Sequence, residues 1–304
     1  MSKLKRILKS WEKIARPSLQ LQGFKHYGKD GFGRITHGDV FQYFLFQPHR
    51  HTDSFTVEVC IRPLFCENGE HLNLRPGNRL GYMATRPGLD KWWTCTTDEE
   101  TDKSVNEALL LMNEFAMPFY NSTRTCTEII QSYKKNFLGR NKFGNRVNWG
   151  SPGYECFDFG YIYLKVGDYK KASEEFEKCY QMVSSSVRES ERSFAEKYQH
   201  LHQLCKTGSK EVDEVLEAQI QKSLENMNLK KWLYADIYKT IFQQFLSPVE
   251  QSEVETILKS ITKNHITVGA DQLARSILVL ADGNITELKK IVDSNYLCDP
   301  RDVI

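Results

Sequence analysis

The spacing of apolar residues changes twice along this 304-residue chain. It is helical in residues 4–15, and from about residue 24 to 96 apolar residues alternate with polar ones, as in 54–61, where Phe55, Val57, Val59 and Ile61 would share one face of a strand. After about residue 102 they recur at every third or fourth position, which is the period of an amphipathic helix. A run of strands followed by a run of helices predicts an α+β region and then an all-helical region.

The first region is expected to be an antiparallel sheet with flanking helices. An N-terminal helix should end near Leu21, because Gly23 follows as a helix stop. The segment His37-Gly38-Asp39 between two aromatic-rich runs indicates a β-hairpin turn. Later helices are expected to begin at Asp102 or Ser104 and near residue 125. The predicted strands lie at residues 24–27, 32–36, 40–46, 54–61, 81–84 and 92–96.

Only helices are expected from residue 151 onward. Helical segments open near Tyr154, Glu191, Trp232 and Ala270. Their spacing of roughly 37–41 residues is typical of stacked helical hairpins. The polar, Gly-rich segment 139–150 is interpreted as a linker, so the predicted domains are 1–138 and 151–304.

The densest pattern in the chain lies at residues 153–186. Small residues, Gly160 and Ala172, alternate with the bulky Tyr163 and Phe176, and Gly167 marks a turn between two helices. This pattern resembles the tetratricopeptide repeat, in which two antiparallel helices pack closely. We therefore expect Gly160 and Ala172 to face each other across a helical hairpin.

The chain departs from the repeat pattern at two positions. Cys156 stands where the family usually has Trp, and Ser184 stands where a Pro often closes the repeat. A single hairpin in an ordinary helical bundle is the alternative interpretation. The resemblance to the repeat implies binding and not catalysis.

A second resemblance covers residues 1–135. A helix is followed by Gln22-Gly23-Phe24-Lys25, a strand that ends in Phe44-Leu45-Phe46-Gln47, and the strand that begins at Ser54. This order resembles an uncharacterised bacterial family, domain of unknown function 4304. The resemblance implies an α+β fold and supplies no active site. Some of its relatives occur among immunity proteins of bacterial toxin systems, which implies a toxin as partner.

The cysteines and the termini predict a cytoplasmic protein. Eight cysteines stand at positions 60, 66, 95, 126, 156, 179, 205 and 298, and none forms a Cys-x-x-Cys pair. Buried free thiols in a reducing compartment explain them best. The basic N-terminus lacks the apolar core of a secretory signal, and no apolar run has the roughly 20 residues of a membrane span.

One group of basic and aromatic residues is the main candidate binding surface. It can dock an acidic protein, because Trp and Arg dominate interface hot spots. Nucleic acid is the alternative ligand, since bases stack on Trp while Arg meets phosphate. The alternative is a structural role, in which one ring of the Trp pair packs in the core and the other lies at the surface. The group comprises Arg50, Arg62, Arg75, Arg79, Arg86, Trp92 and Trp93.

A metal site has one weak candidate. On an extended strand, His49, His51 and Asp53 would point to one side as a facial triad. Because Pro48 precedes them, they are expected to form a solvated loop without metal. An uncharacterised metal-dependent enzyme centred on them stays an alternative. Dinucleotide, P-loop, nucleophile-elbow and His-Glu-x-x-His motifs are absent, so no catalytic residue or cofactor is predicted.

The two halves of the chain differ in charge. Residues 1–150 carry 22 Lys and Arg against 15 Asp and Glu, and the remainder carries 19 against 24. Such asymmetry is typical of a surface that meets a partner of opposite sign. The sequence therefore predicts a non-enzymatic protein-interaction module, an immunity-type protein in its most concrete version, with nucleic-acid binding or metal-dependent catalysis as alternatives.

Overall fold

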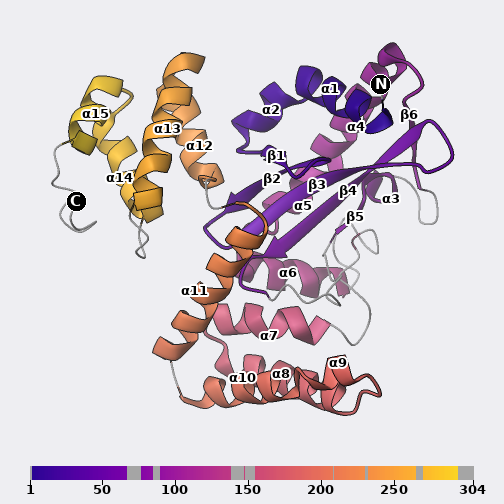
Figure 1. The fold of residues 1–304 in the computed structure, drawn as a ribbon, viewed down its shortest axis with the longest axis vertical. Coiled ribbons are helices and arrows are strands. Elements are labelled where there is room, and N and C mark those ends of the chain that lie inside the picture. Colours follow the sequence, from indigo (N-terminus) through magenta and orange to yellow (C-terminus); the bar gives the residue numbers. More distant parts are fainter. Residues whose placement is uncertain are drawn as a thin grey trace.

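The computed structural model describes residues 2–66, 77–84, 90–137, 147, 155–207, 209–229, 232–264 and 270–293. An antiparallel sheet with flanking helices is followed by a region of many helices (Figure 1). This arrangement confirms the predicted α+β region and the helical region after it.

The described strands form one antiparallel sheet in the order β1-β2-β3-β4-β5, and β6 pairs with β4. The predicted hairpin turn joins β2 to β3. Its His37 and Gly38 have positive φ angles of 47° and 89°, which suits a tight turn between twisted strands. The strands are β1 (Lys25–Tyr27), β2 (Gly31–Thr36), β3 (Val40–Pro48), β4 (Ser54–Pro63), β5 (Gly77–Arg79) and β6 (Trp93–Thr94).

One face of the sheet is covered by the N-terminal helices. The Trp11 ring lies 4.8 Å from the Phe46 ring and 5.6 Å from the Phe44 ring, measured between centroids. All three side chains are almost fully buried. The helices of this region are α1 (Lys3–Ile14), α2 (Arg16–Leu21), α3 (Leu80–Ala84), α4 (Asp98–Leu111), the π-helical turn η1 (Met112–Ala116), α5 (Met117–Asn121) and α6 (Cys126–Phe137).

Two details of the predicted elements are wrong. Residues 81–84 form the helix α3 and not a strand, because Leu80 and Met83 bury their side chains together at helical spacing. The helix expected from Asp102 or Ser104 begins earlier, at Asp98. There the Thr97 hydroxyl accepts a hydrogen bond from the backbone N–H of Glu100 at 3.2 Å, as an N-cap.

The remaining described elements are all helices, as expected. Helices α7 and α8 form a hairpin with a tight turn. Gly167 has a φ of 77°, and the Asp168 carboxylate caps α8 by accepting from the Lys171 N–H at 3.3 Å. The helices are α7 (Glu155–Lys165), α8 (Tyr169–Ser184), α9 (Glu189–Arg192), α10 (Ala195–Thr207), α11 (Ser209–Asn226), α12 (Ala235–Gln244), α13 (Pro248–Asn264), α14 (Ala270–Ala281) and α15 (Ile285–Asp293).

Gly160 leaves room for a ring of the second helix. A Cβ atom built on Gly160 would lie 2.7 Å from the Phe176 ring. Ala172, one turn before Phe176 on α8, is fully buried. The expected contact of Gly160 with Ala172 stays a prediction.

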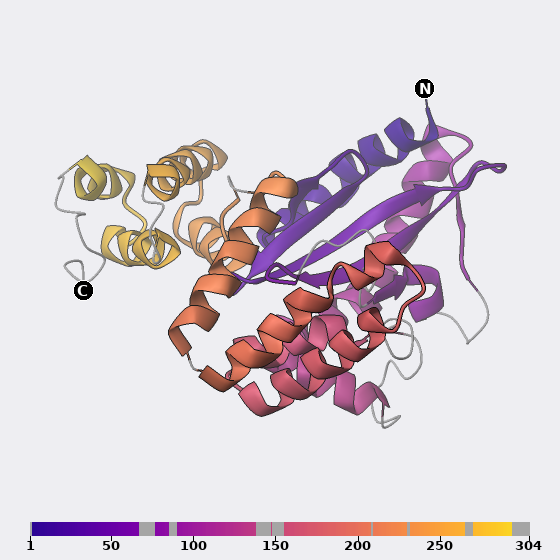
Figure 2. The same ribbon diagram turned by 60° about the horizontal axis from the view of Figure 1, so that its bottom comes forward.

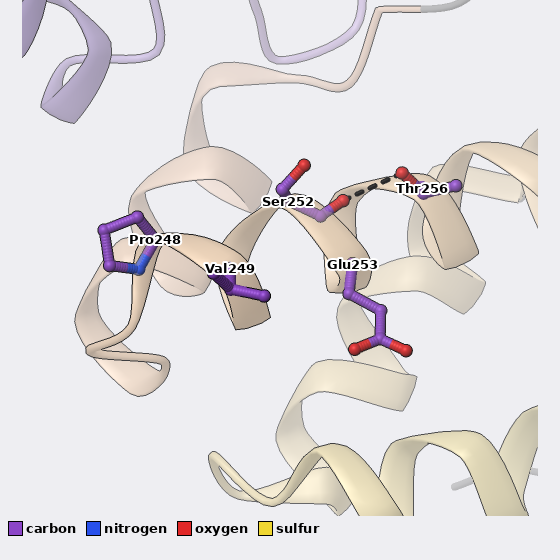
Figure 3. A pocket seen from close by; sticks show the side chains of 5 residues that line it. All are labelled: Pro248, Val249, Ser252, Glu253 and Thr256. Carbon is purple, nitrogen blue, oxygen red and sulfur yellow. Dashed lines mark hydrogen bonds between the residues drawn. The ribbon is translucent and has the colours of Figure 1, made fainter.

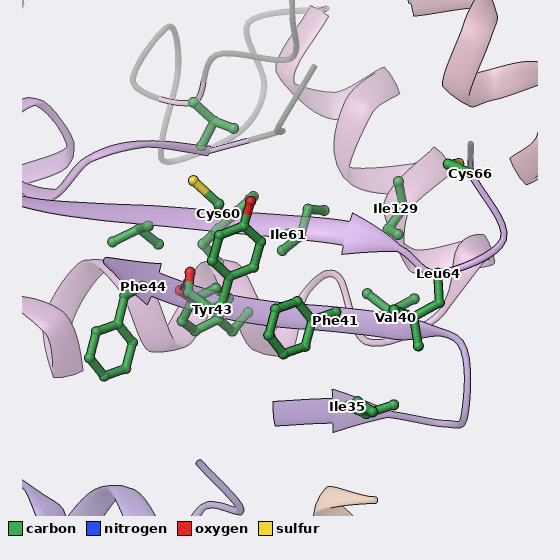
Figure 4. Close-up of a cluster of buried hydrophobic side chains, with 14 of the residues drawn as sticks. Ile35, Val40, Phe41, Tyr43, Phe44, Cys60, Ile61, Leu64, Cys66 and Ile129 are labelled. Atoms are coloured by element: carbon green, nitrogen blue, oxygen red, sulfur yellow. Dashed lines mark hydrogen bonds between the residues drawn. The ribbon is translucent and has the colours of Figure 1, made fainter. Parts of the chain in front are cut away.

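The buried side chains form two separate cores. The first runs from Ile7 to Leu229 and joins the sheet to helices α7, α8, α10 and α11, and Figure 4 shows the part of it around the strands and Ile129. The second runs from Leu233 to Leu288 and lies within α12–α15, which Figure 2 shows as a group beside the sheet. The predicted linker 139–150 lies outside the described residues except for Val147, which is buried. The predicted domain boundary therefore stays a prediction.

Among the described residues, no helix is both long and apolar enough to cross a bilayer. Six cysteines of the described part of the chain are free thiols and are buried. They are Cys60, Cys66, Cys95, Cys126, Cys179 and Cys205.

Candidate functional site

The face of the sheet opposite Trp11 carries the candidate site. Successive side chains of a strand point to opposite faces, so Tyr43 and Leu45 of β3 point away from the face that holds Phe44. Arg62 of β4 pairs with Phe41 and joins the same outer face. We call this surface the outer sheet face.

Two glycines of β2 give the aromatic residues room on the outer sheet face. A Cβ atom on Gly31 would lie 2.6 Å from the Leu45 side chain, and one on Gly33 would lie 2.5 Å from the Phe41 ring. Both distances are too short for a real side chain. Because β2 carries no side chain at these two positions, rings from the two neighbouring strands meet above it. The ring centroids of Tyr27 on β1 and Tyr43 on β3 are 5.7 Å apart.

A pocket of about 290 Å³ opens on the outer sheet face. The sheet forms its floor, and the end of α11 forms a wall. Its volume lies near the lower end of the range for small-molecule sites, roughly 300–1,000 Å³. We call it the sheet-face pocket. Its lining residues are Tyr27, Gly28, Asp30, Tyr43, Leu45, Arg62, Asn226 and Met227.

The pocket contains an arginine and an aspartate that do not pair with described residues. In the part of the chain that the structure describes, no ion pair within 4 Å and no side-chain hydrogen bond involves the Arg62 guanidinium or the Asp30 carboxylate. Arg62 is half-buried. An unpaired, half-buried guanidinium is a poor arrangement for stability but a good one for binding an anionic group.

Arg62 does have a buried electrostatic neighbour in Asp158 of α7. Burial raises the pKa of Asp158 to about 7, while the Cys66 thiol and the charge of Arg62 act in the opposite direction. Near neutral pH, part of the Asp158 population is therefore uncharged.

The lining of the pocket suits binding. It offers the five N–H donors of a guanidinium, an amide, two phenol rings and a carboxylate. The lining residues include no Cys, His, Ser or Thr, so they hold no nucleophile with an adjacent base. This arrangement can orient a polar side chain or a short polar segment.

The predicted basic and aromatic residues have different surroundings. Arg62 lies in the sheet-face pocket, whereas Arg79 pairs with Asp90 at 2.8 Å and lies 5.3 Å from the Trp92 ring centroid. Arg50 is exposed in the turn between β3 and β4.

Only one of the two tryptophans is accessible. Trp93 is 2% exposed and stacks on Phe55 at 5.8 Å, so it is a core residue. Trp92 is half-buried, with the His49 ring against it at 4.9 Å. Arg75 and Arg86 lie outside the described residues. Bases therefore have no pair of stacking platforms in the described part of this group.

The three residues of the predicted metal triad, His49, His51 and Asp53, lie in the turn between β3 and β4. The Nδ1 atom of His49 accepts hydrogen bonds from the N–H groups of His51 at 3.2 Å and Thr52 at 3.1 Å. The Asp53 carboxylate pairs with Lys3 at 3.3 Å. Across the described residues, no group of three or more His, Cys, Asp and Glu has a metal-binding arrangement.

A second concavity, of about 560 Å³, lies along α13 (Figure 3). The described residues that line it all belong to α13. Its one charged residue, Glu253, pairs with Lys289 at 2.6 Å. The lining residues are Pro248, Val249, Ser252, Glu253 and Thr256. We therefore place the candidate site at the sheet-face pocket.

Most residues of this pocket escape prediction from sequence. Arg62 was a candidate, but Tyr27, Asp30, Tyr43 and Asn226 were not. The available signal was Gly31-Phe-Gly33 at alternate positions of a strand, because such glycines often mark a close approach of other groups. No comparable signal marks the end of α11.

Comparison with known proteins bears on the N-terminal region only. No curated protein matches the chain, and no solved structure matches it. The model of one family does match, over the residues that form α2 to α5 and include the sheet. The wall that α11 contributes to the pocket lies outside the match. Residues 15–122 thus match the family described as a domain of unknown function, DUF4304, which confirms the resemblance of the N-terminal region.

Proposed function

We propose that the protein is a non-enzymatic interaction module that receives an acidic side chain of a protein partner in the sheet-face pocket. The observation that carries this proposal is the half-buried guanidinium of Arg62, which opens into the pocket without an ion-pair partner among the described residues.

A carboxylate of the partner would supply the ion pair that Arg62 does not form with the described residues. A carboxylate can accept two parallel N–H bonds from a guanidinium, and such charge-assisted bonds are roughly twice as strong as neutral ones. Tyr27 and Tyr43 supply rigid walls with a polar tip. Tyr and Arg are also the residue types that dominate binding energy at protein interfaces.

The most concrete version is an immunity-type protein that neutralises a toxin in the bacterial cytoplasm. Its support is the resemblance of the N-terminal region to a family with relatives among immunity proteins. In this version Arg62 anchors an acidic residue of the toxin, and α11 holds the partner against the sheet.

The test is co-expression of the protein with the product of the neighbouring reading frame. If that product is toxic alone, the wild-type protein should restore growth, and the Arg62→Glu variant should not. Arg50→Glu is the matched control, because Arg50 is exposed and lies outside the pocket. Equal protection by both variants would contradict a role for the pocket.

A salt titration distinguishes a nucleic-acid ligand from a protein partner. A labelled single-stranded DNA should not bind the purified protein tightly. If it does bind, with an affinity that falls steeply with salt and is lost in Arg62→Glu, the pocket serves phosphate and not a protein.

A further inference from the structure

The sheet-face pocket has a charged end and an aromatic end. On the outer sheet face, Tyr27 of β1 lies opposite Gly31, and Gly31 lies opposite Leu45. Tyr27 and Leu45 therefore stand in one row across the sheet. Arg62 lies opposite Phe41, four positions from Leu45 along β3. At about 3.3 Å per residue, Arg62 is roughly 13 Å from that row along the strands.

The end of the pocket away from Arg62 is lined by rings and apolar side chains. The Tyr43 ring meets the Tyr27 ring edge-on, at 5.7 Å between centroids and 63° between planes. Leu45 and Met227, which directly follows α11, belong to the same lining. A third ring can pack edge-to-face on such phenol rings, and a thioether makes favourable contacts with it. This end therefore suits an aromatic side chain.

An acidic side chain alone would fill one end of the pocket only. The pocket of about 290 Å³ extends from Arg62 to Tyr27 and Gly28, so a carboxylate at Arg62 leaves the aromatic end to water. An apolar group in that place is more favourable than water, because the free energy gained is proportional to the apolar area that is buried. The pocket therefore favours a ligand that brings an apolar group together with its anion.

The distance between the two ends matches side chains two residues apart. At about 1.5 Å per bond, the Arg62 side chain takes up about half of the roughly 13 Å between its strand position and the row of Tyr27 and Leu45. About 7 Å remain for the ligand. In an extended segment, side chains two residues apart lie on one face, about 6.5–7 Å from each other.

We infer that the acidic residue of the partner lies in an extended segment and is accompanied, two positions away, by an aromatic residue that packs against Tyr27 and Tyr43. This inference rests on the proposed function and specifies the chemistry of its partner. The segment lies along β3, between the sheet and the end of α11, with its acid at Arg62.

Four short peptides test the inference on the full-length protein. Each is an acetylated, amidated pentapeptide of glycine in which the second and fourth residues are Glu and Phe, Glu and Ala, Gln and Phe, or Gln and Ala. Binding is measured from backbone amide shifts of the isotope-labelled protein. The Glu and Phe peptide should bind at least about tenfold more tightly than the other three, because each of them lacks the charged or the apolar contact.

Substitutions at the two ends of the pocket should act separately. Arg62→Gln should abolish the preference for Glu over Gln and keep the preference for Phe over Ala. Tyr27→Ala and Met227→Ala should each reduce the preference for Phe at least about threefold and keep the preference for Glu. Arg50→Gln is the control, because Arg50 is exposed outside the pocket. Melting temperatures show that each variant is folded, and Met227→Ala tests the aromatic end if Tyr27→Ala is not.

Three outcomes would overturn the inference, and they bear differently on the proposed function. If the Glu and Ala peptide binds as tightly as the Glu and Phe peptide and depends on Arg62, the inference falls and the proposed function stands. If the Gln and Phe peptide binds as tightly as the Glu and Phe peptide, the acidic side chain has no part in binding and both fall. If no peptide shifts the amides of the pocket, the inference falls, and the growth assay with Arg62→Glu decides the proposed function by itself.

Discussion

The Lys25 ammonium on β1 and the Glu255 carboxylate on α13 form an ion pair between residues 230 positions apart in the sequence. The Tyr238 hydroxyl donates to the same carboxylate at 3.0 Å, and its ring lies 4.4 Å from the Lys25 Nζ atom. Burial lowers the pKa of Lys25 to about 8, although Glu255 acts in the opposite direction. This partly buried network links the core of α12–α15 to the edge of the sheet.

Removal of the Glu255 charge should loosen α12–α15 from the sheet. Glu255→Gln leaves Lys25 partly buried without its counter-charge, so the attachment should weaken by about 1–3 kcal/mol. Hydrogen exchange should accelerate in α12–α15 and stay unchanged in α8. Glu287→Gln is the control, because it breaks an exposed pair with Lys290, and exposed pairs contribute well under about 1 kcal/mol. Equal exchange in both variants would contradict the role of Lys25 and Glu255.

Gln42 should be essential for the stability of the sheet. It is fully buried, donates to the carbonyls of Tyr120 and Thr123 at 2.6 and 3.1 Å, and accepts from Arg34 at 2.9 Å. Gln42→Leu leaves these buried groups without partners and should lower the free energy of unfolding by about 2–4 kcal/mol. Urea denaturation measures this change.

The control for this prediction lies on the same strand. Gln47 is exposed, so Gln47→Leu should change the free energy of unfolding by less than about 0.5 kcal/mol. A similar effect of both substitutions would mean that β-strand propensity, and not the buried hydrogen bonds of Gln42, determines the result.

Asp158 should make stability fall with rising pH. Burial raises its folded-state pKa from 3.8 to about 7, so between these values the unfolded chain has lost its proton while the folded protein retains it. The free energy of unfolding should therefore decrease across this window, by up to about 4 kcal/mol at about 1.4 kcal/mol per pKa unit. Above pH 7, Asp158→Asn should be more stable than the wild type.

The free energies of unfolding of the wild type and of Asp158→Asn should converge below pH 3.8, where the carboxyl group of Asp158 is protonated in both the folded and the unfolded state. Thermal melts across the pH range measure the difference, with the exposed Asp213→Asn as control. A wild-type stability that rises between pH 4 and 7 relative to Asp158→Asn would show that Asp158 is charged and well paired in the folded protein.

The hairpin of α7 and α8 should respond to volume changes at its centre. Phe176→Ala empties the space over Gly160 and should cost about 3–5 kcal/mol. Ala172→Leu adds volume at a fully buried position and should cost about 1–3 kcal/mol. Lys170→Ala, at an exposed position of α8, should cost well under about 1 kcal/mol. Thermal melts with similar values for all three variants would mean that the hairpin is not packed in solution.

Some elements were predictable because their pattern is local and long enough. The alternation in 54–61 marks β4, and Gly167-Asp168 between two amphipathic segments marks the turn from α7 to α8. The segment 81–84 was mispredicted as a strand. Four residues are too few to distinguish a period of two from one of 3.6, and the burial of Leu80 with Met83 decides for a helix.

The sequence alone determined most of the order of strands and helices, since side-chain periodicity and turn stereochemistry act between near neighbours in the chain. Only the tertiary structure decided the sheet-face pocket. Tyr27, Arg62 and Asn226 come from strands and a helix that are remote in sequence. Whether Arg62 finds a partner in the protein or opens into a pocket depends on how α11 packs over the sheet. That packing is a sum of many small contacts between distant segments, and no local pattern encodes it.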